Sequence, residues 1–198
     1  MIEIRWHGRG GQGAKTAALL LADAAFETGL HVQGFPEYGP ERMGAPITAY
    51  NRLSDGPIRI HSNIYNPDLV VVVDETLLKS VDVAAGLKDT GKLLVNTNSD
   101  PESVLRSFPG VKGDIWVIDA MDISIRTIGR NLPNTPLLSA VVRLTGIMGE
   151  EAFFKNMEKA FGEKFARKRE VIEGNMRAVK EAWASVLQIN EQARGKDV

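Results

Sequence analysis

Cysteine is absent from all 198 residues of the chain. The chain therefore forms no disulfide, has no thiolate nucleophile, and offers no cysteine ligand for zinc or an iron–sulfur cluster. Long apolar runs are also missing, because the run at residues 69–73 is far too short to span a bilayer. Residues 2–7 contain no basic stretch leading into an apolar segment, so we expect a cytoplasmic protein without a membrane partner.

An excess of one charge is lacking as well. The chain has 24 Lys plus Arg against 25 Asp plus Glu, so no global field favours a nucleic acid partner. Hydrophobic residues make up 43% and charged residues 25%, which are ordinary values for a globular protein. The length suits one domain over residues 1–198, with a helical tail over about 165–198.

Strand and helix patterns alternate through the first two thirds of the chain. Residues 2–7 predict a strand, the Ala/Leu-rich stretch at 13–28 predicts a helix, and residues 31–35 predict a second strand. Three apolar runs then predict strands buried on both faces, with helical segments between them, at residues 68–74, 92–95 and 115–119. This alternation predicts an α/β fold with a doubly wound, mostly parallel sheet.

Two segments depart from that alternation. Residues 47–53 and 57–61 flank the turn signal Ser54-Asp55-Gly56, which predicts an inserted antiparallel hairpin. After Pro136 the chain is predicted to be helical without strands, over 137–148, 150–161 and about 165–192. The last helix has an apolar stripe that must pack against the body or a partner. Its members are Val171, Ile172, Asn175, Val179, Ala182, Trp183 and Val186.

A G-x-G-x-x-G motif lies between the first predicted strand and the first predicted helix. Its residues are Gly8, Arg9, Gly10, Gly11, Gln12 and Gly13. Backbone N–H groups and the helix dipole at such a loop favour a phosphate group. The alternative is that the glycines only permit a tight turn. The motif alone leaves both interpretations open.

The neighbouring residues fit two familiar phosphate ligands poorly. A dinucleotide site needs an acid at the end of the second strand, whereas Glu37 follows a proline inside a loop. A nucleoside triphosphate loop needs a lysine directly after its last glycine, whereas Ala14 separates Gly13 from Lys15. Lys15 is either a phosphate contact or a solvated side chain.

The segment 35–46 reads F-P-E-Y-G-P-E-R-M-G-A-P, and from Pro36 to Pro46 it is too rich in Gly and Pro to form a regular element. Arg42 is a candidate for gripping a carboxylate or phosphate with two hydrogen bonds. Alternatively, Glu37, Glu41 and Arg42 pair locally or against a partner chain.

Other polar residues give weaker signals. The histidines are scattered without metal-ligand spacing and are expected to be structural: His7, His31 and His61. The acids Asp74, Glu75 and Asp119 follow predicted strands and are expected to cap helices. Residues 96–98 and 131–136 either cap a helix or contact a ligand. The pattern contains no nucleophile with a base, no acid–base pair and no metal cluster, so we predict binding without catalytic residues.

Four segments, in this order and spacing, resemble the gamma subunit or gamma domain of 2-oxoacid:ferredoxin oxidoreductases. They read RWHGRGGQGA at 5–14, F-P-x-x-G-x-E-x-x-G-A-P at 35–46, NPDLVVVVD at 66–74 and NTPLLSA at 134–140. The second segment is the most specific, and the resemblance covers nearly the whole chain. Pyruvate:ferredoxin oxidoreductase, also called pyruvate synthase, is the most similar member in appearance.

The resemblance implies a multi-subunit complex that converts a 2-oxoacid, with pyruvate as the leading candidate, and coenzyme A into acyl-CoA and CO2. It implies thiamine diphosphate and Mg between alpha- and beta-type subunits, 4Fe-4S clusters in a ferredoxin-like subunit, and ferredoxin or another electron acceptor. The gamma domain of such complexes is Rossmann-like and associated with CoA. The motif residues 8–13, Lys15 and Arg42 thus become candidates for contacting CoA, while the chain alone is expected to be inactive and to hold no cofactor.

Three hypotheses follow. In the first, the chain is the non-catalytic gamma subunit of an oxidoreductase complex. In the second, it is a stand-alone oxidoreductase whose glycine loop binds a dinucleotide. In the third, it is a scaffold whose glycine loop only packs against another subunit.

Overall fold

The computed structural model describes residues 1–37, 43–166 and 168–190. Within these residues seven strands form one sheet, in the order β2-β3-β1-β4-β5-β6-β7. They are β1 (Ile2–Arg9), β2 (His31–Pro36), β3 (Pro46–Ser54), β4 (Leu69–Val72), β5 (Lys92–Asn96), β6 (Asp114–Ile118) and β7 (Leu187–Gln188). β1, β4, β5 and β6 pair in parallel, whereas β3 pairs antiparallel with β1 and β2, and β7 antiparallel with β6. The predicted mostly parallel α/β fold is confirmed.

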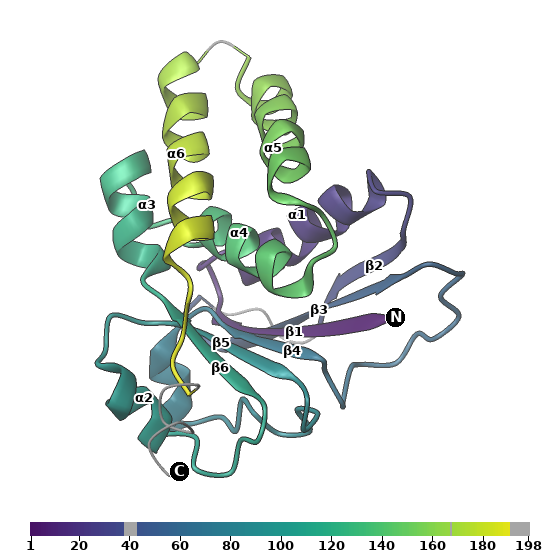
Figure 1. Ribbon diagram of the computed structural model, residues 1–198, viewed down its shortest axis with the longest axis vertical. Coiled ribbons are helices and arrows are strands. Elements are labelled where there is room, and N and C mark those ends of the chain that lie inside the picture. The colour runs from purple at the N-terminus through teal and green to yellow at the C-terminus, as the bar shows by residue number, and fades with distance from the viewer. Residues whose placement is uncertain (38–42, 167, 191–198) are drawn as a thin grey trace.

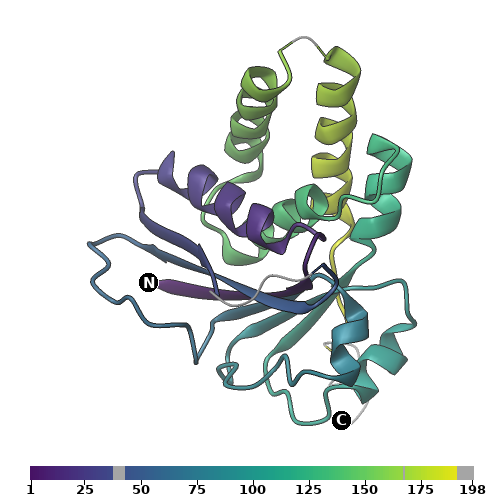
Figure 2. The ribbon, with the colours of Figure 1, turned by 180° about the vertical axis from the view of Figure 1, so that it is seen from behind.

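Helices cover the two faces of the sheet unequally. They are α1 (Ala14–Phe26), the short 3-10 helix η1 (Glu75–Lys79), α2 (Pro101–Arg106), α3 (Ala120–Ile128), α4 (Asn134–Thr145), α5 (Glu150–Lys164) and α6 (Arg169–Ser185). Figures 1 and 2 show α1, α3, α4, α5 and α6 gathered on one face and α2 on the other. No helix among the described residues is long and apolar enough to cross a membrane.

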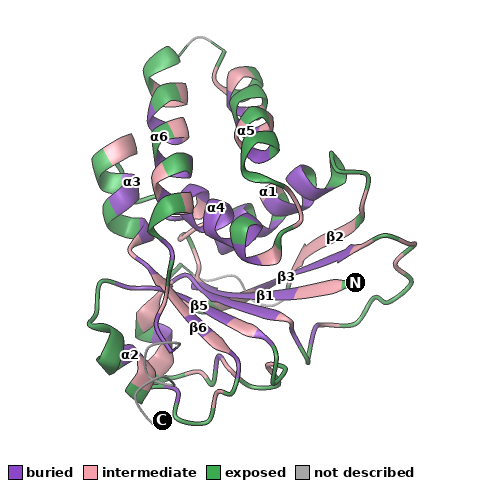
Figure 3. Cartoon of the chain, in the orientation of Figure 1, coloured by how far each residue is buried: buried purple, intermediate pink, exposed green. Residues whose placement is uncertain are grey.

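Each face has its own hydrophobic core. On the helical face Leu69 and Val71 of β4 join the cluster that includes Trp6, whereas Val70 and Val72 join the opposite cluster with Val104 of α2. The alternation of side chains along a strand explains this division. β4 is therefore buried on both faces, as its continuous apolar run predicts, and Figure 3 shows the burial concentrated in the sheet and the inner sides of the helices.

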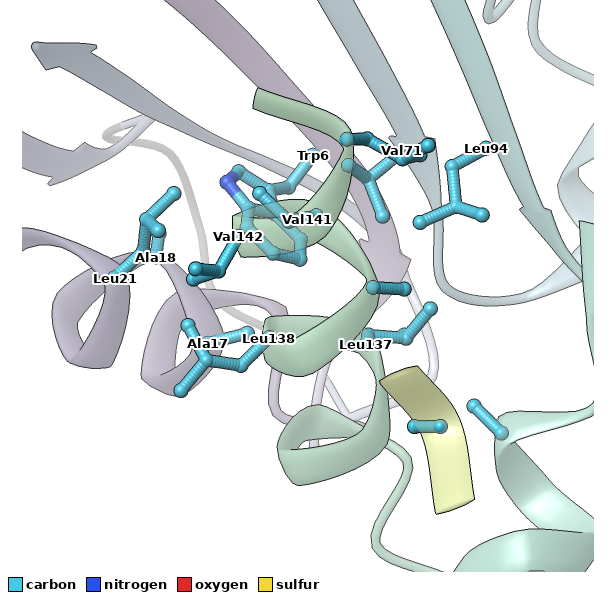
Figure 4. Packing of buried hydrophobic residues seen from close by; sticks show 14 of the residues in the cluster. Trp6, Ala17, Ala18, Leu21, Val71, Leu94, Leu137, Leu138, Val141 and Val142 are labelled. Atoms are coloured by element: carbon cyan, nitrogen blue, oxygen red, sulfur yellow. The ribbon is translucent and has the colours of Figure 1, made fainter. Parts of the chain in front are cut away.

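α4 forms the centre of the larger core. Its residues 135–142 are all buried, and it contacts α1, α3, α6 and β5. Figure 4 shows Leu137, Leu138, Val141 and Val142 of α4 in one cluster with Trp6 of the sheet and Ala17 of α1. A helix that is apolar nearly all round belongs in such an interior position.

The antiparallel part of the sheet differs from the sequence prediction. Residues 57–61 form no strand, and the antiparallel partners of β3 are β1 and β2. Both edges of β3 are thus occupied, which leaves no edge for a strand at 57–61. Residues 60–62 instead direct backbone carbonyls at the buried guanidinium of Arg52, which donates to the carbonyl oxygens of Ser62 at 2.8 Å and Ile60 at 3.5 Å.

Three further predictions needed correction. Between β4 and β5 the only helical segment in the described residues is η1, so the predicted helix there is a single short turn. The last helix ends at Ser185, not near residue 192, and is followed by the strand β7, which the sequence analysis missed. Asn190 fixes this end, because its side chain accepts from the backbone N–H of Ile115 and donates to the carbonyl of Gly113.

The apolar stripe of α6 packs against the chain's own body. Asn175, Val179 and Ala182 are buried, and α6 contacts α3, α4 and α5. Trp183 stacks with Phe153 of α5, with ring centroids 5.8 Å apart. Of the two outcomes expected for this stripe, burial against the body is the one found.

Candidate functional site

The glycine loop lies at the carboxyl end of β1, between the strand and α1. β1 has an antiparallel neighbour on one side, β3, and a parallel neighbour on the other, β4. The helix after β1, α1, packs on one face of the sheet and the turn after β4, η1, on the other, which makes the gap between β1 and β4 a topological switch point. Open α/β sheets bind their ligands in the crevice outside the strand ends at such a point.

Steric constraints require glycine at three positions of the loop. Gly11 has φ +93° and Gly13 has φ +85°, a left-handed conformation that residues with a side chain rarely adopt. A Cβ atom on Gly8 would lie 2.9 Å from Cβ of Ala14, too close for van der Waals contact. These glycines have steric reasons to be present, so the prediction of ligand binding depends on what surrounds them.

The beginning of α1 is suited to an anion. Gly13 occupies the N-cap position without a side chain that could cap the helix, and the first turn contains no acidic residue. The first N–H groups of a helix have no intrahelical acceptor and carry the positive end of the dipole. Lys15 and Thr16 line a depression of about 370 Å³ there. Its remaining lining residues are Gly10, Gly11, Gly13, Met43 and Ile47.

The two motifs that were predicted separately form one structure. The N–H of Gly10 donates to the carbonyl of Ala45 at 2.9 Å, and the N–H of Gly44 donates to the carbonyl of Gly10 at 3.1 Å. Nη1 of Arg9 also donates to the carbonyl of Gly44, at 3.1 Å. The side chain of Met43 is 89% exposed at the mouth of the depression. Residues 43–46 are therefore bonded to the glycine loop, and Met43 lines the depression beside it.

The alternative prediction, that Glu37, Glu41 and Arg42 pair locally or against a partner chain, remains a prediction, since Glu37 is the only one of the three among the described residues. Glu37 accepts a hydrogen bond from the hydroxyl of Tyr50 at 3.3 Å. Burial, together with the charge of Glu37, raises the pKa of Tyr50 to about 12, so this hydroxyl stays protonated. Arg42 and Glu41 lie outside the described residues, and the Arg42 prediction remains a prediction.

On the other side of the glycine loop, four side chains form what we call the loop clamp: Arg9, Gln12, Asp74 and Thr76. Gln12 accepts from the N–H of Arg9 at 2.9 Å and donates to Asp74 at 2.5 Å. Asp74 also accepts from the N–H and the hydroxyl of Thr76, at 2.9 and 2.7 Å, and lies 3.3 Å from Nε of Arg9. Burial alone would raise the pKa of Asp74, but the bonds from Gln12 and Thr76 and the charge of Arg9 together lower it.

A second depression, of about 630 Å³, lies beyond the loop clamp at the ends of β4, β5 and β6. Its walls carry the acids Asp74, Glu75, Asp119 and Asp122. As predicted, Asp74 caps η1 and Asp119 caps α3, where it accepts from the N–H of Asp122 at 2.8 Å. Asn96 joins the strand ends, since it accepts from the N–H of Ala120 and donates to the carbonyl of Val73.

This arrangement bears on the dinucleotide hypothesis. Asp74 ends the parallel neighbour of β1, where a Rossmann protein could offer an acid to a ribose hydroxyl. Its two carboxylate oxygens already accept bonds from Gln12 and Thr76. The acid that would recognise a ribose is thus used to hold the loop.

His7 is buried next to the glycine loop but outside both depressions. Its Nε2 accepts from Nε of Arg5 at 3.0 Å, and Arg5 in turn donates to the carbonyls of Val83 and Ala85. Burial, reinforced by the charge of Arg5, lowers the pKa of His7 to about 4. His7 is therefore neutral at pH 7 and structural, as predicted. Within the described part of the chain no three His, Asp or Glu side chains are grouped to hold a metal ion.

The family described as pyruvate ferredoxin/flavodoxin oxidoreductase matches residues 3–185 of the sequence. The chain belongs to this family. The pyruvate synthase subunit PorC of Thermotoga maritima is 54% identical over 184 residues, which are 93% of this chain and 94% of that protein. The common gamma subunit of the pyruvate/ketoisovalerate oxidoreductases of Thermococcus kodakarensis is 49% identical over 174 residues, 86% of this chain and 94% of that subunit.

Solved structures agree with this assignment. The crystal structure of the Thermotoga maritima pyruvate oxidoreductase subunit PORC matches with a TM-score of 0.80 and 48% identity, covering 94% of this chain and 97% of that one. The 2-oxoglutarate:ferredoxin oxidoreductase of Magnetococcus marinus shares the fold at 19% identity, with a TM-score of 0.68, over 92% of this chain and 30% of that one. The prediction of a gamma-type subunit of a 2-oxoacid oxidoreductase complex is confirmed.

Proposed function

We propose that the chain is the gamma subunit of a complex that oxidises pyruvate with ferredoxin as acceptor, and that its glycine loop binds the phosphate groups of CoA. The observation that carries the CoA proposal is the depression at the start of α1, where Lys15 and Thr16 lie in the first turn of a helix whose N-cap residue, Gly13, has no side chain. The Magnetococcus marinus enzyme of the same fold was solved with 2-oxoglutarate, coenzyme A and succinyl-CoA bound, so CoA is the first ligand to test.

The charges around the glycine loop favour the depression at α1 as the site for the phosphates. The depression on the far side has four carboxylates in its wall, and bringing an anion near like charges is unfavourable. The depression at α1 has Lys15 and the positive end of the helix dipole. Met43 and Ile47 at its rim give the apolar parts of CoA, the adenine or the pantetheine arm, surfaces to contact.

The CoA proposal is tested in the assembled complex by Lys15→Glu. We expect the KM for CoA to rise at least about tenfold, since a hydrogen bond to a charged group is worth roughly 1.5–3 kcal/mol and a repulsion replaces it. Decarboxylation of the 2-oxoacid before CoA enters should be unchanged. The control is Lys79→Glu, which makes the same charge change at an exposed residue of η1. An unchanged KM in Lys15→Glu would overturn the proposal.

Partners and cofactors are proposed from the same resemblance. Because the chain has no cysteine, the 4Fe-4S clusters are assigned to a ferredoxin-like subunit, and thiamine diphosphate with Mg to alpha- and beta-type subunits. A native pull-down from the source cell, followed by an assay of CoA-dependent 2-oxoacid oxidation, tests this assignment. We expect thiamine-binding and iron–sulfur chains with activity, most strongly on pyruvate; a chain recovered alone would contradict it. The cytoplasm stays the location predicted from the sequence.

A purely structural role is the second candidate. It is supported by the steric requirements that account for Gly8, Gly11 and Gly13 without a ligand. Gly10→Val separates the two proposals. If the loop only packs against another subunit, the variant fails to assemble, and any complex that does form keeps a normal KM for CoA.

A further inference from the structure

The loop clamp connects the segment that contains Arg9 and Gln12 with two segments that are distant in the sequence, at Asp74 and at Gly44. Asp74 lies between β4 and η1, Gln12 belongs to the glycine loop, and Arg9 reaches from the end of β1 to the carbonyl of Gly44. The side chain of Asp74 is 13% exposed, so these bonds are partly shielded from water. Gln12 is held at both ends, since its Oε1 accepts from the N–H of Arg9 and its Nε2 donates to Asp74.

The position of Gln12 determines the path of the loop. Gln12 lies between Gly11 and Gly13, the two residues with positive φ, and its own N–H donates to the carbonyl of Arg9 at 3.0 Å. Releasing its side chain removes the only side-chain anchor between two glycines, which are the most mobile residues in a loop. The depression at α1 is lined by Gly11 and Gly13, so its shape depends on this anchor.

We propose that Asp74 is a positioning residue, which holds the glycine loop through Gln12 and Arg9 in the conformation that binds CoA phosphates. The proposal rests on the proposed function of the loop. Asp74 lines the acidic depression on the opposite side of the loop from Lys15 and acts on the ligand only through the loop.

The sign of the effect distinguishes positioning from simple charge. If Asp74 were only a nearby anion, neutralising it would reduce repulsion and tighten CoA binding. If it positions the loop, Asp74→Asn loses the acceptor for Gln12 or Thr76 and weakens CoA binding. The two possibilities therefore predict changes of KM in opposite directions.

The experiment measures the KM for CoA and kcat of the complex with Asp74→Asn. We expect KM to rise about tenfold, the loss that corresponds to ~1.4 kcal/mol, while kcat at saturating CoA stays within about twofold. Asp122→Asn is the matched control, because it removes the same charge from the same depression and touches Arg126 instead of the loop. KM should stay the same or fall in the control.

A double-mutant cycle with Gln12→Leu tests the route. If Asp74 acts through Gln12, the rise of KM in the double variant is clearly smaller than the product of the two single rises, because both changes remove the bond between Asp74 and Gln12. Multiplicative effects would show that Asp74 acts independently and would overturn the inference. If the Asp74→Asn complex assembles poorly, hydrogen exchange of the full chain replaces the kinetics: residues 9–16 should exchange faster than in the wild type, and unchanged exchange would overturn the inference.

The outcomes also separate this inference from the proposed function. If Lys15→Glu raises the KM for CoA and Asp74→Asn lowers it or leaves it unchanged, the inference fails and the CoA function stands. If neither variant changes KM, the glycine loop does not bind CoA and both fail.

Discussion

Lowering the pH from 7.5 to 5 should reduce the free energy of unfolding of the chain by about 2 kcal/mol through the titration of one side chain, His7. In an unfolded chain histidine titrates near pH 6.5. In the folded chain burial beside Arg5 lowers the pKa of His7 to about 4. The unfolded state therefore binds a proton between pH 6.5 and pH 4 that the folded state does not. The stability from neutral His7 is complete above pH 6.5 and is lost as the pH falls towards 4, by ~3 kcal/mol in total.

Urea unfolding of the wild type and of His7→Gln at pH 7.5 and pH 5 measures this loss. Glutamine keeps an acceptor for Arg5 but does not titrate, so the wild type should lose about 2 kcal/mol more than the variant across this range. Carboxylates that titrate at lower pH, including Asp74, contribute equally to both proteins. His31→Gln, at an exposed position of β2, should follow the wild type. The reasoning would be refuted if the difference in unfolding free energy between the wild type and His7→Gln were the same at pH 7.5 and pH 5 within about 0.5 kcal/mol.

Three further changes test the fold that supports the site. Asn51→Leu should lower the free energy of unfolding, measured in urea, by about 2–4 kcal/mol. It leaves the buried indole N–H of Trp6, now 2.8 Å from the Asn51 oxygen, without an acceptor. Asn98→Leu, at an exposed position, is the control and should change the stability little. Gly34→Val should lower the stability by about 1–3 kcal/mol, because the Cβ atom of the new side chain would already lie 3.1 Å from Cβ of Ala22. Gly56→Val is the control, since a Cβ atom at Gly56 meets nothing within 4 Å. Arg52→Met should cost about 3 kcal/mol, because Glu3 loses the partner now 2.8 Å away, and a cost below about 1 kcal/mol would contradict this.

The sequence was sufficient for elements whose pattern is local. The run that became β4 is apolar at every position and short, which is the pattern of a strand buried on both faces. The glycine loop was recognisable because backbone sterics restrict Gly11 and Gly13 to glycine. Asp74 and Asp119 were correctly expected to cap helices, since capping depends on the next three residues. The same expectation for Glu75 was wrong, because its carboxylate accepts from the hydroxyls of Thr97 and Ser99 instead.

What the sequence could not predict depends on long-range pairing. The turn signal at residues 54–56 is real, but whether its two flanks pair depends on β1 and β2 having already occupied the edges of β3. β7 is two residues long and exists because β6 offers an edge for it. A strand of that length has no detectable periodicity.

In the candidate site, too, the sequence indicated the local features but not the long-range contacts. Gly8, Lys15 and the 35–46 segment were each singled out, but nothing in the sequence indicated that Gly10 and Gly44 are hydrogen-bonded. Asp74 was recognised as a cap and not as the partner of Gln12, because 62 residues separate the two. The specific family motif was the one signal that joined these segments before the structure did.

The most direct test of the account is hydrogen exchange of the assembled complex, followed by mass spectrometry with and without CoA. The account predicts that CoA slows exchange in this chain at residues 9–16 and 43–47, around the depression at the start of α1, and that Lys15→Glu removes the protection. Protection confined to the partner subunits, with both segments of this chain unchanged, would contradict it.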